Sequence, residues 1–277
     1  LRLWVATTDY SGELNISNEI IKRVADSYRR IRNTLRFLSA NLEDFDAKKM
    51  LIDPKEMLSI DKYGLYLTDE LQNNIIKDYE NFDFYLGMQK FLSFCSEDMG
   101  GFYLDVIKDR LYTTKEDSKA RRSAQTALFH IVHSLIRIMA PILTFTAEEL
   151  WGVINKNSKN TIFIESWYKL PDHGLSKKEL LAWSNTLKVR NLVNKKIEAL
   201  REKSIVGSSL QAEVKISVPL EIYESLNSFE DELKYILITS NVLLSSSKKD
   251  FKIEVKASKN KKCDRCWHYV SNIGLNS

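Results

Sequence analysis

The sequence contains little glycine, proline or cysteine: its 277 residues include 9 glycines, 4 prolines and 3 cysteines. Few helix-breaking residues, together with 44% apolar residues, indicate a helix-rich globular protein. The length suggests roughly two domains. Three cysteines are too few for a disulfide framework, which favours a reducing compartment.

Long hydrophobic runs are also missing. No apolar stretch approaches the roughly 18 residues of a membrane span, and no signal peptide is recognisable. The 41 basic residues nearly balance the 37 acidic ones, so binding to nucleic acid would have to depend on local clusters. A Gly-rich phosphate loop, a nucleophile elbow and a His-Glu-x-x-His motif are all absent. We therefore expect a cytoplasmic protein with no membrane partner and no catalytic residue in this chain.

Helical periodicity dominates the first 150 residues. After Ser17, an expected N-cap, apolar residues at steps of three and four predict a helix of about 25 residues. Thr146 and Glu149 have the spacing of a capping box at the start of a short helix. The other helices predicted here cover residues 60–81, 84–108 and 118–139. Long helices with short connections predict an antiparallel bundle.

The pattern changes beyond residue 155. Between residues 155 and 177 the composition becomes polar, which indicates a domain boundary. The elements predicted after the bundle are a short strand at 161–165, a helix at 180–203, strands at 212–218 and 251–255, and a helix at 223–239 between those strands. The expected fold class is therefore mainly α: a helical bundle, then a small α/β module in which a β-α-β unit packs on a long helix.

The first long helix has a polar face opposite its apolar stripe. Guanidinium groups can bind phosphates through paired hydrogen bonds and can stack on unpaired bases, and an asparagine can contact a base edge. A solvated helix face is the simpler interpretation, because Asp26 lies on the same side. The residues on or beside this face are Arg29, Arg32, Asn33 and Arg36.

Three other features have structural interpretations. His130 and His133 share one side of a predicted helix, but their apolar neighbours and the lack of a further ligand place them at the edge of a core. Cys95 is expected to be a buried, small apolar residue. A basic cluster between Arg110 and Arg122 is typical of a loop and a helix start.

Cys263 and Cys266 form a Cys-x-x-Cys knuckle near the end of the sequence. Two thiolates two residues apart can chelate one ion in a tight turn, and thiolates in a structural turn favour zinc. Zinc needs about four ligands, so the others are expected outside this chain. We therefore expect the chain to be part of a longer protein. Trp267 could stack on bases or could pack over the metal.

Five stretches, in order along the chain, closely resemble the bacterial isoleucyl-tRNA synthetases, which are class I aminoacyl-tRNA synthetases. They are LRLWVATTDYSGE (1–13), DSYRRIRNTLRFL (26–38), FYLDVIKDR (102–110), APILTFTAEELW (140–151) and CDRCWHY (263–269). The resemblance covers the whole chain. The chain lacks that family's His-x-Gly-His and Lys-Met-Ser-Lys-Ser signatures and its second cysteine pair.

This resemblance implies a parent enzyme that attaches isoleucine to tRNA using ATP, with ATP bound only in a catalytic domain outside this chain. It implies that the chain itself is non-catalytic and binds the anticodon stem and loop of isoleucine tRNA as a monomer, with no DNA partner. Arg29, Arg32, Asn33, Arg36 and Trp267 are the implied tRNA contacts. Cys263 and Cys266 are the implied zinc ligands.

Together, the patterns and the resemblance predict five parts. They are a connector from the catalytic domain (1–17), an anticodon-binding helical bundle (18–160), a linker (161–179), a small α/β junction domain (180–258) and a truncated zinc-binding module (259–277). Two alternatives remain open. One is a helical interaction module with a degenerate knuckle, which would expose an apolar groove. The other is a related synthetase for valine, leucine or methionine.

Overall fold

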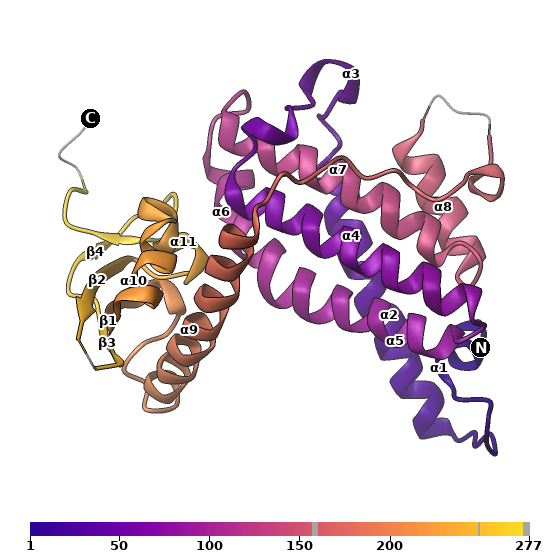
Figure 1. The fold of residues 1–277 in the computed structure, drawn as a ribbon, viewed down its shortest axis with the longest axis horizontal. Coiled ribbons are helices and arrows are strands. Elements are labelled where there is room, and N and C mark those ends of the chain that lie inside the picture. Colours follow the sequence, from indigo (N-terminus) through magenta and orange to yellow (C-terminus); the bar gives the residue numbers. More distant parts are fainter. Residues whose placement is uncertain (157–159, 249, 274–277) are drawn as a thin grey trace. The chain divides into compact units, whose positions relative to one another are not determined.

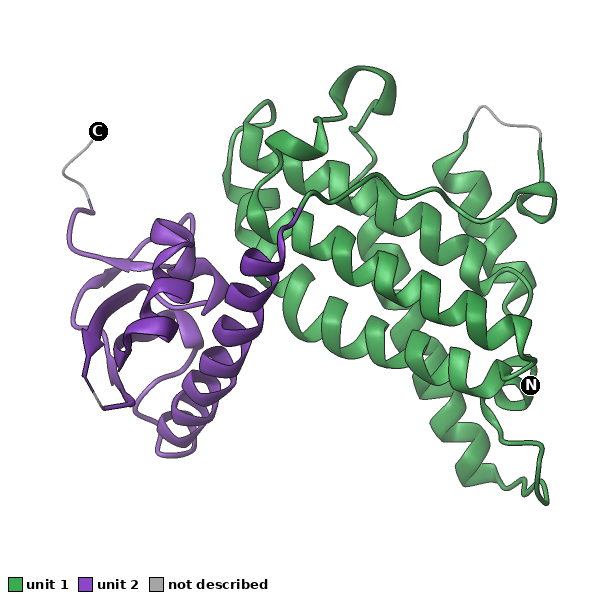
Figure 2. Ribbon diagram, viewed as in Figure 1, with its two compact units in different colours: residues 1–174 green, residues 175–277 purple. Residues whose placement is uncertain are grey.

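The computed structural model describes residues 1–156, 160–248 and 250–273, and the chain divides into two compact units (Figures 1 and 2). Unit 1 comprises Leu1–Gly174 and unit 2 comprises Leu175–Ser277. Their boundary lies within the polar stretch 155–177, whereas the finer five-part division stays a prediction. Among the described residues, no helix combines the length and apolar character needed to span a membrane.

Unit 1 is a helical bundle. Its α-helices are α1 (Arg2–Thr7), α2 (Asn18–Ala40), α3 (Ala47–Met50), α4 (Ser59–Glu80), α5 (Phe84–Ser93), α6 (Leu104–Thr113), α7 (Lys119–Met139) and α8 (Thr144–Ile154). A ten-residue π-helix, Phe94–Tyr103, joins α5 to α6 without interruption. Short 3₁₀ turns cover Pro54–Glu56 and Ile162–Ile164. The helical bundle expected from the sequence is confirmed.

Helix α7 lies at the centre of the bundle and contacts α2, α4, α6 and α8. Its residues Leu128, Ile131 and Leu135 have no exposed surface. A helix that is apolar on most sides is expected at a core, whereas α2 has one apolar face and covers that core from outside.

A buried carboxylate connects four elements of the bundle: α4, the π-helix, α6 and α7. Asp61 of α4 is 0% exposed and accepts two hydrogen bonds from the Arg110 guanidinium, at 2.9 and 3.0 Å. It also accepts from the Tyr103 hydroxyl at 2.9 Å and from the Ser123 hydroxyl at 2.5 Å. Arg110 therefore has a structural role inside α6, whereas the sequence analysis expected a loop and a helix start for its basic cluster.

Two local expectations for unit 1 were wrong. Helix α8 begins at Thr144, and the Thr146 hydroxyl pairs with the Tyr28 hydroxyl at 2.8 Å, so Thr146 and Glu149 form no capping box. Residues 161–165 form no strand. Instead, the Glu148 carboxylate accepts hydrogen bonds from the Thr161 hydroxyl and the Ile162 amide, which holds a 3₁₀ turn there.

Unit 2 contains a three-stranded sheet covered by helices. Its elements are α9 (Lys177–Glu202), a 3₁₀ turn (Ser209–Gln211), β1 (Ala212–Pro219), α10 (Leu220–Asn227), a 3₁₀ turn (Glu230–Glu232), α11 (Leu233–Ile236), β2 (Asn241–Ser247), β3 (Lys252–Ala257), β4 (Lys261–Lys262) and β5 (Tyr269–Val270). The strand order is β2-β1-β3. Helix α10 contacts α9, β1 and β2, and α9 contacts β3. Trp183 and Phe229 pack edge to face inside this layer, with ring centroids 4.5 Å apart.

The small α/β module is confirmed, but its connectivity differs from the expected one. Strand β1 pairs in parallel with β2, which the sequence analysis missed, and antiparallel with β3. The β-α-β unit therefore returns through residues 241–247, not 251–255. The single helix expected over 223–239 is divided into α10, a 3₁₀ turn and α11. Helix α9 begins at Lys177, where Ser176 and Glu179 form a capping box.

Removal of the buried Asp61 carboxylate should strongly destabilise unit 1. Asp61→Ala removes the buried carboxylate that accepts hydrogen bonds from the Arg110 guanidinium and from the Tyr103 and Ser123 hydroxyls, at an expected cost of about 3–5 kcal/mol in the free energy of unfolding. The exposed pair of Asp105 and Lys108 provides the control, because Asp105→Ala should cost at most about 1 kcal/mol. Urea unfolding checks both values, and equal costs would contradict the structural role of Asp61.

Two histidines of α7 attach the extended segment 165–168 to that helix. The His130 ring bonds to the Tyr168 hydroxyl at 2.8 Å, and the His133 ring stacks on Tyr168 at 5.4 Å. Arg137 donates to Glu165 at 2.7 Å. Burial lowers the pKa of both histidines to about 4, with a further contribution from Arg137 at His133. Their expected place at the edge of the core is confirmed.

These lowered pKa values predict a stability that depends on pH. The unfolded state takes up the histidine protons near pH 6.5 and the folded state only near pH 4. Their contribution is therefore complete above pH 6.5 and is lost as the pH falls towards 4, at about 1.4 kcal/mol for each pH unit and histidine. His133→Phe keeps a ring but removes one titrating group, so the variant should lose less stability between pH 7 and pH 5 in urea unfolding. Identical losses would contradict this assignment.

Candidate nucleic-acid interface and metal knuckle

Helix α2 carries the four candidate RNA-binding residues of unit 1. Its first turn is capped by Ser17, whose hydroxyl accepts a hydrogen bond from the Ile20 amide at 3.2 Å, as predicted. Ile31, Leu35 and Leu38 are fully buried on its inner side. The burial of this stripe turns the opposite face of the helix towards solvent.

Three polar contacts fix the rotation of α2 about its axis. The Thr34 hydroxyl donates to the Cys95 carbonyl in the π-helix at 3.1 Å. The Tyr28 hydroxyl pairs with Thr146 of α8. Arg32 donates two hydrogen bonds to Glu149 of α8, at 2.9 and 3.1 Å. Cys95 is 1% exposed, which confirms the buried role expected for it.

The structure brings Arg29, Arg32, Asn33 and Arg36 to the exposed side of α2. Arg29 forms an exposed ion pair with Asp26 at 2.6 Å, and Arg32 is held by Glu149. The side chains of Asn33 and Arg36 form no hydrogen bond or ion pair within residues 1–156, 160–248 and 250–273. Asn33 and Arg36 are therefore the two members of this set most available to a ligand.

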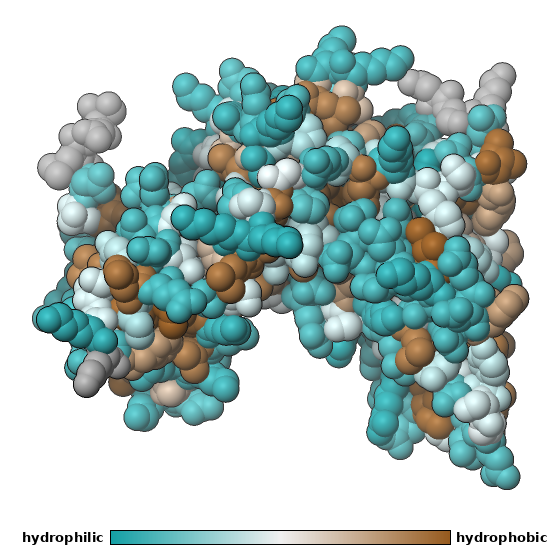
Figure 3. Space-filling view, viewed as in Figure 1, coloured by the Kyte–Doolittle hydropathy of each residue, from teal (hydrophilic) through white to brown (hydrophobic). Residues whose placement is uncertain are grey.

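The two paired arginines are also accessible to a ligand. Exposed ion pairs contribute only up to about 1 kcal/mol, so a phosphate can compete with Asp26 or Glu149 for a guanidinium. Arg30, which the sequence analysis did not include, is exposed on the same helix. Figure 3 shows that, on the face it presents, apolar side chains of unit 1 are scattered among hydrophilic ones. Among the described residues drawn on that face, the apolar side chains do not merge into one continuous surface of the kind an interaction module would use.

In unit 2, Cys263 and Cys266 lie in the turn between β4 and β5, two short antiparallel strands. The Cys263 amide donates to the His268 carbonyl at 2.8 Å, and the Trp267 amide donates to the Cys263 carbonyl at 2.9 Å. Backbone amides of Cys266 and Arg265 donate to the Cys263 sulfur, and they lower the pKa of that thiol. The turn therefore favours a thiolate, which is the form that binds metal.

Trp267 and His268, which follow Cys266, differ in exposure: the Trp267 side chain faces solvent and the His268 side chain is buried. Trp267 has a φ of +63° and is 59% exposed, with the Lys262 ammonium 5.0 Å from its ring centre. An exposed ring beside a cation suits stacking on a base. His268 is 6% exposed and packs edge to face on Tyr235 at 5.4 Å. Within the described part of the chain, no group of three or more His, Cys, Asp or Glu residues could hold a metal ion.

Comparisons with known proteins bear on both candidate sites. Residues 61–216 match the family described as the anticodon-binding domain of tRNA ligase, which is more than half of the chain. The chain belongs to this family. Helix α2 precedes the matched residues, so its arginine face has to be connected to anticodon binding by other relatives.

Other relatives align with the whole chain, so their alignments also cover the residues of α2. Isoleucine–tRNA ligases from Paraburkholderia phytofirmans and Cupriavidus pinatubonensis are 50% and 48% identical to it, over 279 and 280 residues. Isoleucine–tRNA ligase from Burkholderia cenocepacia strain HI2424 is 48% identical over 279 residues. Each alignment covers 100% of this chain and 29% of the relative. The chain therefore spans less than a third of the length of these relatives.

Proposed function

We propose that this chain binds the anticodon stem and loop of isoleucine tRNA, as part of a cytoplasmic, monomeric isoleucine–tRNA ligase. The observation that carries the proposal is the exposed arginine and asparagine face of α2, in a chain 50% identical along its whole length to part of such a ligase. The family match supports the anticodon as the bound region.

The α2 face can perform two tasks in RNA binding. The guanidinium groups of Arg29, Arg32 and Arg36 can neutralise backbone phosphates, which contributes affinity independent of sequence and makes binding sensitive to salt. The Asn33 amide can donate to and accept from a base edge, which contributes selectivity. In unit 2, the exposed Trp267 ring can stack on an unpaired base.

The chemical steps of the ligase are proposed to occur outside this chain. Isoleucine activation with ATP and transfer to tRNA would take place in the parts of the protein that correspond to the remaining 71% of the relatives. This chain would position the tRNA for that reaction. The family name and the relatives support such a division of tasks.

We further propose that Cys263 and Cys266 are two of the ligands of a structural zinc ion. Their thiols lie in one tight turn whose backbone amides face the Cys263 sulfur. The remaining ligands would come from outside the described residues, because a tetrahedral site needs about four. Zinc would hold β4 and β5 together and thereby fix the position of the Trp267 ring.

Substitution of Arg36 should weaken tRNA binding without affecting the fold, because its side chain is exposed. Arg36→Ala removes a phosphate or base contact, and it should raise the Kd for an isoleucine anticodon stem-loop about 10-fold. Fluorescence anisotropy with a labelled stem-loop measures this change.

Lys77→Ala provides the matched control, because Lys77 is an exposed cation of α4 remote in sequence from the α2 face. It should leave the Kd unchanged. In the complete ligase, Arg36→Ala should raise the apparent KM for tRNA and leave tRNA-independent isoleucine adenylation intact. Equal effects of the two substitutions on the Kd would contradict a specific role for α2.

Loss of either knuckle thiol should reduce zinc binding. Cys263→Ser and Cys266→Ser each remove one of the two sulfur ligands, so isothermal titration of the chain with zinc should show weaker binding or none. Cys95→Ala is the control, because that thiol is 1% exposed and should not contribute. The metal assignment fails if all three variants bind zinc like the unsubstituted chain.

A further inference from the structure

A groove of about 720 Å³ runs between helix α9 and strand β3 of unit 2. One wall is the part of α9 from Leu192 to Leu200, and the other is formed by residues 251–255. At 1.5 Å per helical residue and 3.3 Å per strand residue, these walls are about 12 Å and about 13 Å long. The groove is therefore as long as a strand of about five residues.

The hydrogen bonds of the sheet show which residues of β3 are paired with β1. Just beyond the ladder of the two strands, the Ser258 amide donates to the Gln211 carbonyl at 2.7 Å. The next carbonyl, that of Ala212, instead accepts from the Ser240 amide, on the β2 side of β1. Bonded and non-bonded pairs alternate along antiparallel strands, so residues 252, 254 and 256 of β3 bond to β1.

Strand β3 consequently has a free edge. In the sheet order β2-β1-β3, it lies at one side of the sheet. Ile253 and Val255 occupy the non-bonded positions and turn their N–H and C=O groups away from β1. Both residues line the groove, and no described residue outside the sheet forms a backbone hydrogen bond to them. Such an edge is a template for an added strand.

Apolar side chains accompany the free edge. Leu192 and Phe251 are exposed in the groove, and Leu200 and Val255 are half-buried there. Every second side chain of an added strand would lie over α9, on the side of the sheet that this helix covers. Apolar side chains at those positions would cover this surface, which favours binding.

The charges of the groove favour an acidic partner. Lys195 and Lys196 of α9 are exposed and form no hydrogen bond or ion pair with another described residue. Lys252 is paired with Glu254 at 2.6 Å. With three lysines and one glutamate, the lining has an excess of positive charge. A second copy of this chain would bring the same lysines against one another, so the groove suits a carboxylate from a different protein.

The spacing along α9 indicates where that carboxylate would lie. Lys195 and Lys196 are midway between Leu192 and Ala199, about 5 Å along the helix from each. Side chains on one face of a strand are about 7 Å apart. A strand with an apolar, an acidic and an apolar side chain at every second position therefore matches this wall.

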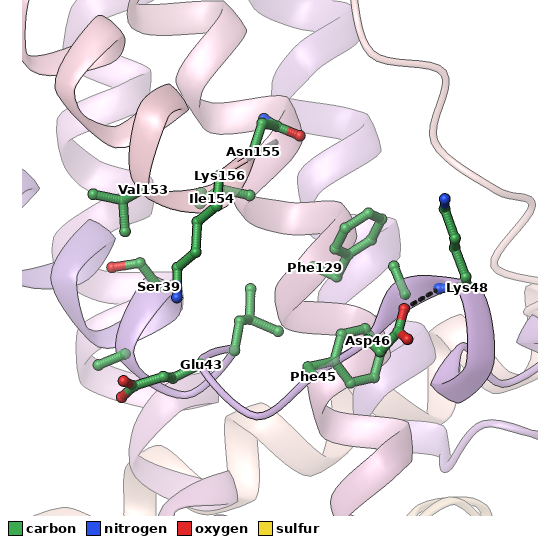
Figure 4. A pocket seen from close by; sticks show the side chains of 13 residues that line it. Ser39, Glu43, Phe45, Asp46, Lys48, Phe129, Val153, Ile154, Asn155 and Lys156 are labelled. Carbon is green, nitrogen blue, oxygen red and sulfur yellow. Dashed lines mark hydrogen bonds between the residues drawn. The ribbon is translucent and has the colours of Figure 1, made fainter. Parts of the chain in front are cut away.

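The pocket of unit 1 shown in Figure 4 lacks this combination. Its lining residues belong to helices α2, α3, α7 and α8 and to the segments that follow α2 and α8, so it contains no strand edge. Glu43 and Asp46 balance Lys48 and Lys156 at its lining. Lys48 is exposed there and provides a control for the charge of the α9–β3 groove.

We infer that the α9–β3 groove binds an extended segment of a partner protein, which adds a strand to the free edge of β3. The segment carries an acidic side chain between two apolar ones on the face that lies over α9. A phosphate backbone would also match the lysines, but it has no row of N–H and C=O groups to pair with the strand edge. This site is separate from the proposed tRNA-binding residues and does not rest on that function.

The test titrates the ¹⁵N-labelled 277-residue chain with the peptide Thr-Val-Thr-Glu-Thr-Val-Thr, followed by NMR. The peptide should shift the amide signals of Ile253 and Val255 and slow their hydrogen exchange. The Glu254 amide should keep its exchange rate, because it already bonds to β1. The same peptide with lysine in place of glutamate should have a Kd about 10-fold higher.

Two variants locate the binding site. Val255→Pro removes an N–H group from the free edge and no hydrogen bond to β1, and edge strands tolerate proline at such positions. Lys195→Glu combined with Lys196→Glu reverses the charge of α9 and keeps the test valid if Val255→Pro does not fold. Each variant should raise the Kd of the acidic peptide about 10-fold. Lys48→Glu, the control, should leave it unchanged.

Four results would overturn the inference. They are no binding of the acidic peptide, equal affinity for the acidic and the basic peptide, an unchanged Kd in both groove variants, and a free chain that is dimeric in sedimentation equilibrium and becomes monomeric with Val255→Pro. The last result would assign the edge to a second copy of this chain. Displacement of the peptide by the anticodon stem-loop would equally overturn the inference, because the groove would then bind RNA.

Discussion

The burial of one stripe of α2 against the bundle is the constraint on which the candidate interface depends. Ile31, Leu35 and Leu38 are fully buried, and α2 contacts α1, α7, α8 and the π-helix. Because an α-helix turns about 100° per residue, fixing this stripe also fixes the direction of every other side chain on it. The arginine face is thus held in place by apolar packing on the opposite side of the helix.

Polar contacts also fix the rotation and position of α2 in the bundle. Tyr28 and Arg32 both bond to α8, and Thr34 bonds to the π-helix, so α2 can neither rotate nor slide without losing hydrogen bonds. Asp61 has a comparable role deeper in the bundle, where it joins α4, α6 and α7. The candidate binding residues therefore lie on a rigid element, which would limit the entropy lost on binding a ligand.

Sequence periodicity predicted the long helices well, because each has an apolar face that repeats every three or four residues. The exposed side of α2 followed directly from the same pattern. Strand β2 was missed because its last three residues, Ser245, Ser246 and Ser247, have no apolar alternation; its pairing with β1 defines it. The Thr146 capping box failed because a contact remote in sequence, with Tyr28, uses the hydroxyl. The attachment of segment 165–168 to α7 could not be predicted, since His130 and Tyr168 come together only in the folded bundle.

Salt-titrated binding is the most direct test of whether this chain recognises an anticodon by itself, as proposed. The affinity of the unsubstituted chain should be measured for the anticodon stem-loop of isoleucine tRNA and for the same stem-loop with a changed anticodon. We expect tighter binding to the unchanged anticodon, with an affinity for both RNAs that falls steeply as the salt concentration increases. Equal affinity for the two RNAs at every salt concentration would contradict it, because the chain would then bind only the phosphate backbone.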